Sequence, residues 1–301
     1  MTSSVNSLPM YFPAAPFSLA DAVTCAALVA SAYDQYTQWV NQGSPAGGAF
    51  IWTPASTTID YTYSGPLFWN YPKDEFWEIN EPFGFIAQAT ASGDTFLVLR
   101  GSQSDADYYQ DVVQYQQTPY NFVANYGSVH LGFYQIYKSL SPQIQQALAG
   151  FHNVKRFFFT GHSLGGGLST LAVPDVITNT KLQPSRSLPV LHYNFASPRV
   201  GDPVFAGQIN GSAVPTFRIV NTEDIVPIAL PPIIPALSPY SGALYYQHVG
   251  TPVDFTANYG SVAGNHSLTG AYSYALNNPL DPESGAPLPS RGFVRQADVA
   301  P

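Results

Sequence analysis

The chain is poor in cysteine and in basic residues. Among its 301 residues Cys25 is the only cysteine, so no disulfide can form within the chain and no cysteine-rich metal site is available. Lys and Arg together number 11 against 19 Asp and Glu, which gives a formal net charge of -8 at pH 7. Nucleic acid repels an acidic surface of this kind, so we exclude nucleic acid as a partner.

Long apolar runs are missing as well. The longest helical apolar stretch near the start, residues 22–30, is far shorter than the roughly 18 residues that a membrane span needs. The first basic residue is Lys73, so the start of the chain has no positive segment of the kind that opens a secretory signal peptide. We therefore expect a soluble protein without a transmembrane segment. Its compartment stays open, with secretion as one alternative.

The pattern of apolar residues indicates an α/β fold. Three short runs are typical of strands buried on both faces, at residues 154–160, 190–195 and 216–220. Helical patterns lie between them, which predicts a central, mostly parallel sheet flanked by helices, with sites outside the carboxyl ends of the strands. α/β chains of this length often form one domain. We expect a single domain over residues 1–301, with irregular ends at 1–17 and 279–301.

Four further segments carry local signals. Residues 18–40 show a capped helical pattern, and residues 83–100 show two alternating segments around a Gly-containing turn, which predicts a β-hairpin. A helical region begins near residue 129, and Ser141-Pro142 is expected to interrupt it and restart it with a new cap. Residues 245–255 are expected to form an edge strand or a hairpin.

The strongest chemical signal is Gly161-His162-Ser163-Leu164-Gly165, a Gly-x-Ser-x-Gly pattern between an apolar strand and a predicted helix. A serine on such a turn projects its hydroxyl at the carboxyl end of the sheet, and the flanking glycines let the backbone approach its neighbours closely. The alternative is a Gly-rich turn with a capping serine. The strand before and the helix after favour a nucleophile elbow, with Ser163 as the nucleophile.

A serine hydroxyl needs a base within hydrogen-bond reach and a third group that orients the base. Histidine is the expected base, and hydrolases with this type of turn carry their catalytic residues in the order Ser, Asp or Glu, His. His266, in a loop at the start of the last predicted helix, fits that order best. His248 lies in the middle of a predicted strand and is more simply a structural histidine.

The orienting acid and the oxyanion donors are expected at strand ends. Asp224 directly follows a predicted strand and is the preferred acid; Glu223 and Asp202 compete with it, although Asp202 more simply caps the helix that follows it. An oxyanion hole needs two backbone donors. The candidates are Leu164, just after the nucleophile, and Ser102, in the loop after an early strand.

Five segments, in this order, look like the signatures of one known family: Leu99-Arg100-Gly101-Ser102, Val129-His130-Leu131-Gly132-Phe133, Thr160-Gly161-His162-Ser163-Leu164-Gly165-Gly166, Ser197-Pro198-Arg199-Val200-Gly201-Asp202 and Val220-Asn221-Thr222-Glu223-Asp224-Ile225-Val226-Pro227. They resemble the class 3 lipases, the fungal-type triacylglycerol lipases. The resemblance implies an α/β-hydrolase fold with a short helical lid at residues 104–113.

The same resemblance implies roles for single residues. It implies Ser163, Asp224 and His266 as a catalytic triad, with Ser102 and Leu164 as oxyanion donors. The chain also departs from the family. It lacks the disulfides usual in secreted fungal members, Gly167 stands where alanine is commoner, and segments 50–83 and 230–242 have no clear counterpart. These departures bear on compartment, stability and substrate range.

We therefore expect a serine carboxylic ester hydrolase acting on acylglycerols and other acyl esters. A phospholipase A1 or a feruloyl-type esterase is the alternative within enzymes, and a catalytically silent lipid-binding protein is the alternative from another class. No metal-ligand spacing or phosphate-binding loop is visible, so neither a metal nor a cofactor is expected. Six apolar residues are expected to wall an acyl groove that transiently contacts a lipid–water interface: Tyr108, Tyr109, Val112, Val113, Ile233 and Ile234.

Overall fold

Helices and strands alternate along most of the chain. The computed structural model describes residues 16–72, 78–103, 115–236, 242–278 and 292–293. Its helices are α1 (Leu19–Asn41), α3 (Leu131–Leu148), α4 (Leu164–Asn179), α5 (Pro203–Asn210), α6 (Val262–His266) and α7 (Tyr274–Asn277), with the short turns η1 (Gly47–Ala49), η2 (Val226–Ile228) and η3 (Leu268–Ser273). Its strands are β1 (Tyr61–Tyr63), β2 (Leu67–Pro72), β3 (Glu78–Ala89), β4 (Asp94–Leu99), β5 (Gln117–Pro119), β6 (Ser128–His130), β7 (Arg156–His162), β8 (Val190–Phe195), β9 (Thr216–Asn221), β10 (Ile233–Ile234), β11 (Leu244–Tyr245), β12 (Thr251–Thr256) and β13 (Gly292–Phe293).

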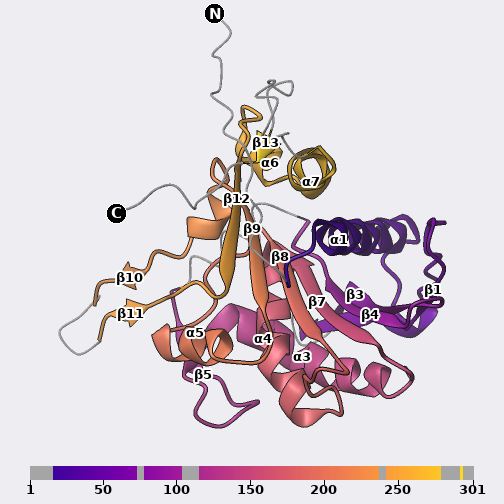
Figure 1. Ribbon diagram of the computed structural model, residues 1–301, viewed down its shortest axis with the longest axis horizontal. Helices are drawn as coiled ribbons and strands as arrows, with labels where there is room; N and C mark the ends of the chain where they lie inside the picture. Colours follow the sequence, from indigo (N-terminus) through magenta and orange to yellow (C-terminus); the bar gives the residue numbers. More distant parts are fainter. Residues whose placement is uncertain (1–15, 73–77, 104–114, 237–241, 279–291, 294–301) are drawn as a thin grey trace, which may run out of the picture.

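A nine-stranded sheet runs through the centre of the molecule (Figure 1). Its order is β1-β3-β4-β7-β8-β9-β12-β13, with β2 also paired to β3. Strands β4, β7, β8, β9 and β12 are parallel to one another, whereas β1, β2, β3 and β13 pair antiparallel at the two sides. The predicted mostly parallel sheet flanked by helices, the core of an α/β-hydrolase fold, is therefore confirmed.

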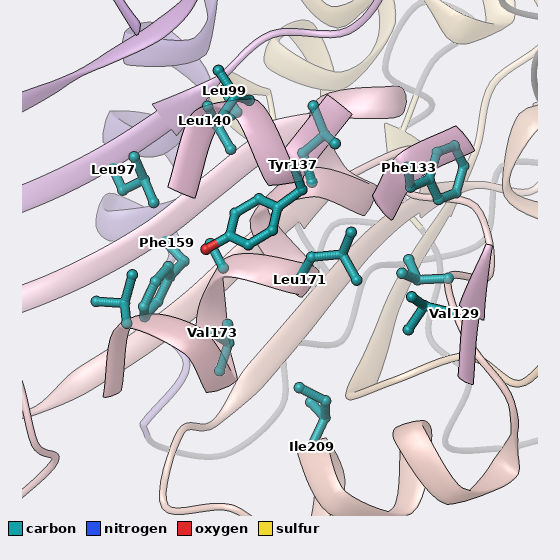
Figure 2. Close-up of a cluster of buried hydrophobic side chains, with 14 of the residues drawn as sticks. Leu97, Leu99, Val129, Phe133, Tyr137, Leu140, Phe159, Leu171, Val173 and Ile209 are labelled. Atoms are coloured by element: carbon teal, nitrogen blue, oxygen red, sulfur yellow. The ribbon is translucent and has the colours of Figure 1, made fainter. Parts of the chain in front are cut away.

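Helices bury both faces of this sheet. Alternate residues of strands β4 and β7 point to opposite faces of the sheet. On one face, the rings of Phe96 and Phe158 stack with their centroids 4.7 Å apart, in the hydrophobic cluster that also contains α1. Leu97 and Phe159 belong to the other cluster, which is completed by α3, α4 and α5. Figure 2 shows this second cluster, with Tyr137 of α3 lying between the strand residues and α4. Since the helices cover both faces, loops from distant parts of the chain meet at the carboxyl ends of the parallel strands.

Helix α3 corrects one local prediction. Ser141-Pro142 does not interrupt the helix, which runs unbroken from Leu131 to Leu148 with Pro142 inside it. The Ser141 hydroxyl, instead of capping a new helix, donates a hydrogen bond to the carboxylate of Asp175 on α4 at 2.6 Å. Residues on both sides of the proline are buried in the core, and this packing keeps the helix continuous despite the backbone hydrogen bond that proline removes.

Residues 245–255 form neither of the two predicted arrangements, an edge strand or a hairpin. The segment contains two short strands that do not pair with each other: β11 pairs with β10, and β12 lies in the central sheet between β9 and β13. His248 lies between them, so it is not in the middle of a strand. Segment 50–83 contains β1, β2 and the start of β3, which begins earlier than the predicted hairpin. Among the described residues, no helix is both long and apolar enough to cross a membrane.

Candidate active site

Ser163 sits on a strained turn between β7 and α4. Its φ of 58° and ψ of -127° are unfavourable for a residue with a side chain, a strain of roughly 1–3 kcal/mol that surrounding structure must hold. The Ser163 N–H donates to the carbonyl of Phe195 on β8 at 2.9 Å, so the turn is tied to the neighbouring strand. This is the strand, serine and helix arrangement of a nucleophile elbow.

Glycines allow the elbow to pack against the end of β4. A Cβ atom at Gly161 would overlap the carbonyl of Gly165, and a Cβ at Gly165 would lie 2.6 Å from the carbonyl carbon of Arg100. A Cβ at Gly101 would lie 2.7 Å from the Cβ of Ser163. The loop that leaves β4, which carries Ser102, therefore rests directly against the candidate nucleophile.

Arg100 holds that loop in place. Its guanidinium is buried, donates from Nε to the carbonyl of Pro82 at 2.8 Å and from Nη1 to the carbonyl of Gly101 at 2.6 Å, and forms an ion pair with Glu81. It also lies over the ring of Tyr36, 4.1 Å from the centroid. With its donors directed at fixed carbonyls, the guanidinium holds the backbone of the loop in one position.

Asp224 and His266 form a hydrogen-bonded pair. His266 Nδ1 donates to Asp224 Oδ2 at 2.7 Å, and the Asp224 side chain is 0% exposed. Two further donors satisfy the carboxylate: the Tyr272 hydroxyl bonds the same Oδ2 at 2.7 Å, and the Val226 N–H bonds Oδ1 at 3.0 Å. Because Nδ1 of the neutral imidazole carries the proton, Nε2 carries the lone pair that a base needs.

His266 is not in the predicted loop: it is the last residue of α6, and two asparagines hold this end of α6 against the end of β9. Asn221 donates from Nδ2 to the carbonyls of Ala257 at 2.8 Å and Asn265 at 3.0 Å. Asn265, in turn, donates from Nδ2 to the carbonyl of Glu223 at 2.9 Å. Sequence reasoning missed these asparagines and Tyr272. The available signal was the place of Asn221 and Asn265 close to Asp224 and His266 in the chain.

His162 joins the elbow to this pair. Its Nε2 donates to the backbone carbonyl of His266 at 2.9 Å, and the two imidazole centroids are 4.6 Å apart. Burial, and then the neighbouring His266, lower the pKa of His162 well below its usual value. The structure thus brings the residue next to Ser163 into contact with His266, which is itself bonded to Asp224. These residues, from three separate parts of the chain, meet at the carboxyl ends of β7, β9 and β12.

The competing candidates do not take part in the Asp224–His266 pair. Burial, together with Arg218, lowers the pKa of His248 to about 2, and its Nδ1 has no hydrogen-bond partner among the described residues. Glu223 accepts a hydrogen bond from Asn258 at 3.3 Å, and Asp202 caps α5 by accepting from a backbone N–H at 2.8 Å. None of these three is bonded to His266.

A second buried Ser–His contact lies between α4, the helix that follows Ser163, and β8. Ser169 Oγ is 2.9 Å from His192 Nε2, and burial lowers the pKa of His192 to about 3. His192 Nδ1 faces the Thr216 hydroxyl at 3.4 Å, not an acid. Asp175, on the same helix as Ser169, accepts hydrogen bonds from Tyr137 and Ser141 of α3 and from Asn179 of α4 instead. This pair joins α4 to the sheet and lacks the orienting carboxylate of a triad.

The expected groove residues divide into three groups. Tyr108, Tyr109, Val112 and Val113 lie outside the described residues, as does the expected lid at 104–113. Ile233 is 54% exposed, and Ile234 is buried in the core. Within the described chain, no group of three or more His, Cys, Asp and Glu side chains is arranged to hold a metal ion.

The sheet topology defines the protein as an α/β-hydrolase fold. Residues 96–233 match the family described as Lipase (class 3), so the matched segment holds Ser102, Ser163 and Asp224, while His266 follows it. The sequence is 29% identical over 153 residues to a lipase of Rhizopus niveus, covering 50% of this chain and 38% of that protein. The resemblance to class 3 lipases is confirmed, and the chain is related to the fungal-type members.

Two further similarities bear on the comparison. The sequence is 28% identical over 173 residues to phospholipase A1-II 1 of Oryza sativa subsp. indica, covering 48% of this chain and 43% of that protein. The fold matches the native Rhizomucor miehei lipase propeptide complex with a TM-score of 0.56 at 23% identity, covering 84% of this chain and 76% of that one. The aligned part of the chain therefore spans about two fifths of the curated relatives, 38% in one and 43% in the other.

Proposed function

We propose that the protein is a serine carboxylic ester hydrolase that acts on acylglycerols and other acyl esters. The observation that carries the proposal is the 2.7 Å bond between Asp224 and His266 beside the strained turn of Ser163. The buried Asp224 carboxylate, which accepts hydrogen bonds from three donors, orients the imidazole and stabilises its charged form. The names of the related lipases support the same class of substrate.

The reaction proceeds in two halves. The Ser163 Oγ attacks the ester carbonyl carbon while His266 Nε2 takes the hydroxyl proton, which forms a tetrahedral oxyanion. The C–O bond to the alcohol then breaks, His266 returns the proton to the leaving alcohol, and the acyl group remains on Ser163. Water then repeats the sequence: its oxygen bonds to the acyl carbon while His266 Nε2 takes its proton. The bond between the acyl carbon and Ser163 Oγ then breaks, His266 returns the proton to Oγ, and the carboxylic acid leaves.

The oxyanion forms where the first turn of α4 meets the loop after β4. The N–H of Leu164 opens that helix and has no carbonyl one turn earlier to bond, so it is available to an oxyanion. Ser102 supplies the second donor from the loop that Gly101 packs against Ser163. The rigid anchoring of this loop by Arg100 favours donors that are in place before the reaction.

Apolar residues next to Asp224 support a lipid substrate. Ile225, Ile228 and Ile233, all on the segment that leaves the Asp224 loop, are 43%, 62% and 54% exposed. Ile234 is in the core, so Ile233 alone of the expected groove pair can reach an acyl chain. We assign these exposed isoleucines to transient contact with a lipid–water interface, because clustered exposed apolar side chains mark interaction surfaces. The related phospholipase A1 makes phospholipid the second candidate substrate.

The triad is tested by single substitutions and hydrolysis of p-nitrophenyl butyrate. Ser163→Ala, Asp224→Asn and His266→Ala should each lower kcat by about 10⁴-fold or more, since the three groups act as one unit. His248→Ala is the matched control and should keep activity within a few-fold. Thermal unfolding of each variant separates loss of chemistry from loss of fold. Near-full activity in His266→Ala together with its loss in His248→Ala would overturn the assignment.

The substrate class is tested by a series of esters from acetyl to palmitoyl, each below its solubility limit, beside emulsified triglyceride and phospholipid vesicles. Each methylene that finds apolar contact can contribute up to about 0.8 kcal/mol, or roughly a four-fold rise in kcat/KM, until the groove is full. Ile233→Ser should lower the gain per methylene without changing the rate with acetyl ester. A steady fall in kcat/KM from acetyl onward would contradict an acyl groove. Cleavage of phospholipid but not triglyceride would favour the second candidate.

A further inference from the structure

Tyr33, on the first helix of the chain, reaches the centre of the site. Its hydroxyl is 2.7 Å from Nδ1 of His162, and it accepts a hydrogen bond from the N–H of Gly101 at 3.0 Å. A Cβ at Gly101 would lie 2.6 Å from this hydroxyl, so the absence of a side chain there leaves the space that the tyrosine fills. One hydroxyl thus touches both the loop that carries Ser102 and the residue preceding Ser163.

The chemistry of the bonded groups decides which group donates and which accepts in each of these hydrogen bonds. The carbonyl of His266 can only accept, so His162 Nε2 must carry the proton that is donated to it at 2.9 Å. Nδ1 of the neutral ring is then an acceptor, and the Tyr33 hydroxyl donates to it. The hydroxyl oxygen in turn accepts from Gly101. The series runs from Gly101 N–H through Tyr33 and His162 to the carbonyl of His266.

The buried surroundings keep Tyr33 and His162 in one protonation state. Burial raises the pKa of the Tyr33 hydroxyl and lowers that of His162, so neither group changes its charge near neutral pH. His162 is 3% exposed, which leaves water little access to compete for its ring nitrogens. A neutral, buried and directional network specifies geometry, because each buried donor or acceptor is costly to leave unpaired.

We propose that Tyr33 and His162 are positioning residues that set the oxyanion loop and the His266 backbone at fixed places on either side of Ser163. Neither touches the reacting atoms. The Asp224 carboxylate sets the rotation of the His266 ring, whereas this network sets the position of the backbone that carries the ring. It also holds the loop of Ser102 at the other end. The proposal rests on the proposed esterase function and adds two residues that act through its catalytic groups.

The kinetic test uses Tyr33→Phe and His162→Leu in the full chain. Tyr33→Phe should lower kcat with p-nitrophenyl butyrate by about 10–100-fold while KM changes less than about three-fold, because displacements near 1 Å at the reacting groups can cost 100-fold. Tyr193→Phe is the matched control. Its hydroxyl also accepts one backbone N–H, from Ser18 at 2.9 Å at the start of α1, but lies outside the site. Equal stability losses in the two tyrosine variants, with a fall in kcat for Tyr33→Phe alone, support positioning.

Coupling is tested by the double variant. If the two residues act as one network, Tyr33→Phe combined with His162→Leu should lower kcat little more than His162→Leu alone. Losses that multiply would mean independent roles and would overturn the network. His162→Gln can still donate to the His266 carbonyl and should recover part of the activity that His162→Leu loses. No recovery, at equal stability, would contradict the donor role of Nε2.

An NMR measurement tests the network independently of activity. The ¹⁵N shifts of the two imidazoles should show His162 protonated on Nε2 and neutral from pH 5 to 8, and Tyr33→Phe should shift the Nδ1 resonance. Protonation on Nδ1, or titration of His162 within this range, would refute the proposal even if the wild-type protein hydrolysed no ester. Absence of hydrolysis in the wild type, with the expected His162 spectrum, would overturn the proposed function and leave the network standing.

Discussion

Gly167 and Gly165, two residues apart in α4, should respond very differently to the same substitution by alanine. Replacing Gly167 by alanine removes the backbone freedom of a helix-interior glycine, which favours the folded state by about 0.5–1 kcal/mol. The new Cβ would lie 3.3 Å from Cδ2 of the Phe133 ring and 3.7 Å from Val200 Cγ2, so the ring need move only a few tenths of an ångström. We expect Gly167→Ala to change the free energy of unfolding by less than about 1 kcal/mol, since the small overlap offsets the helical gain.

The methyl group added by Gly165→Ala would instead meet backbone atoms at the end of β4. Its Cβ would overlap the carbonyl oxygens of Leu99 and Arg100 and lie 2.6 Å from the Arg100 carbonyl carbon. These atoms have no rotamer to change, so α4 and the end of β4 must separate. Overpacking of this kind costs about 3 kcal/mol or more, above the usual 1–3 kcal/mol, because rigid backbone is displaced. The displaced segment leads into the loop of Ser102, and a shift near 1 Å there should lower kcat about 100-fold.

Urea unfolding at pH 7 and hydrolysis of p-nitrophenyl butyrate measure the two effects. Gly167→Ala is the internal control, since it adds the same methyl group to the same helix. The expected result is a large difference in both stability and kcat between the variants. If Gly165→Ala unfolded at the urea midpoint of the wild type and kept its kcat, the close approach of α4 to β4 would not constrain the site, and the reasoning would fail.

Two further predictions concern the core behind the elbow helix. Asp175→Ala should lower the free energy of unfolding by about 3 kcal/mol or more in urea titrations, because it leaves the hydroxyls of Tyr137 and Ser141, each 2.6 Å from the carboxylate, buried without an acceptor; a loss under 1 kcal/mol would contradict this. His192 takes up its proton near pH 6.5 when unfolded but only near pH 3 when folded, so unfolding binds a proton between these values and stability falls with falling pH through that window. The wild-type free energy of unfolding should therefore fall by about 1.4 kcal/mol more per pH unit than that of His192→Asn between pH 6 and 4, and equal slopes would refute the buried neutral state.

The elements that sequence predicts well are those specified by neighbouring residues. The strand at β7, the turn at Ser163 and the start of α4 follow one another directly, so the apolar run, the small glycines and the helical pattern all act locally. The same holds for β8 and β9: apart from the partly buried Arg218, every residue of these two strands is buried, as in strands covered on both faces. Asp224 follows β9 at the predicted sheet edge, which is why chain order and topology together indicate its meeting with His266.

The features that sequence does not predict depend on partners far along the chain. Ser141 before Pro142 has the pattern of a helix start, but its hydroxyl is used by Asp175, and core packing around the proline keeps α3 intact. Tyr33 lies on the apolar face of α1, so the sequence pattern indicates a core residue. Only the fold brings its hydroxyl to Gly101 and His162. No local periodicity could distinguish that tyrosine from a packing residue.

A short isolated pairing explains the error at residues 245–255. Gln247 forms a single bridge to Gly201, and this contact with a loop after β8 bends the chain away from one continuous strand. Alternation of apolar residues is present on both sides of the bend, so the pattern alone cannot locate the break. The turn at Gly250, with φ of 73°, then directs β12 back beside β9.

The attachment of α6, which ends at His266, to Asn221 at the end of β9 has a consequence for biosynthesis. Ser163 is made before His266, with the intervening chain of about 100 residues emerging at about 5–20 residues per second, so the serine exists for roughly 5–20 s before its base has been synthesised. For most of that time β12 has not been made, and the side chain of Asn221 lacks the carbonyls of Ala257 and Asn265 that it binds in the folded protein. A nascent chain stalled before residue 266 should therefore carry a folded elbow but hydrolyse no ester. The activity appears only when the last parallel strand is added at the side of the sheet.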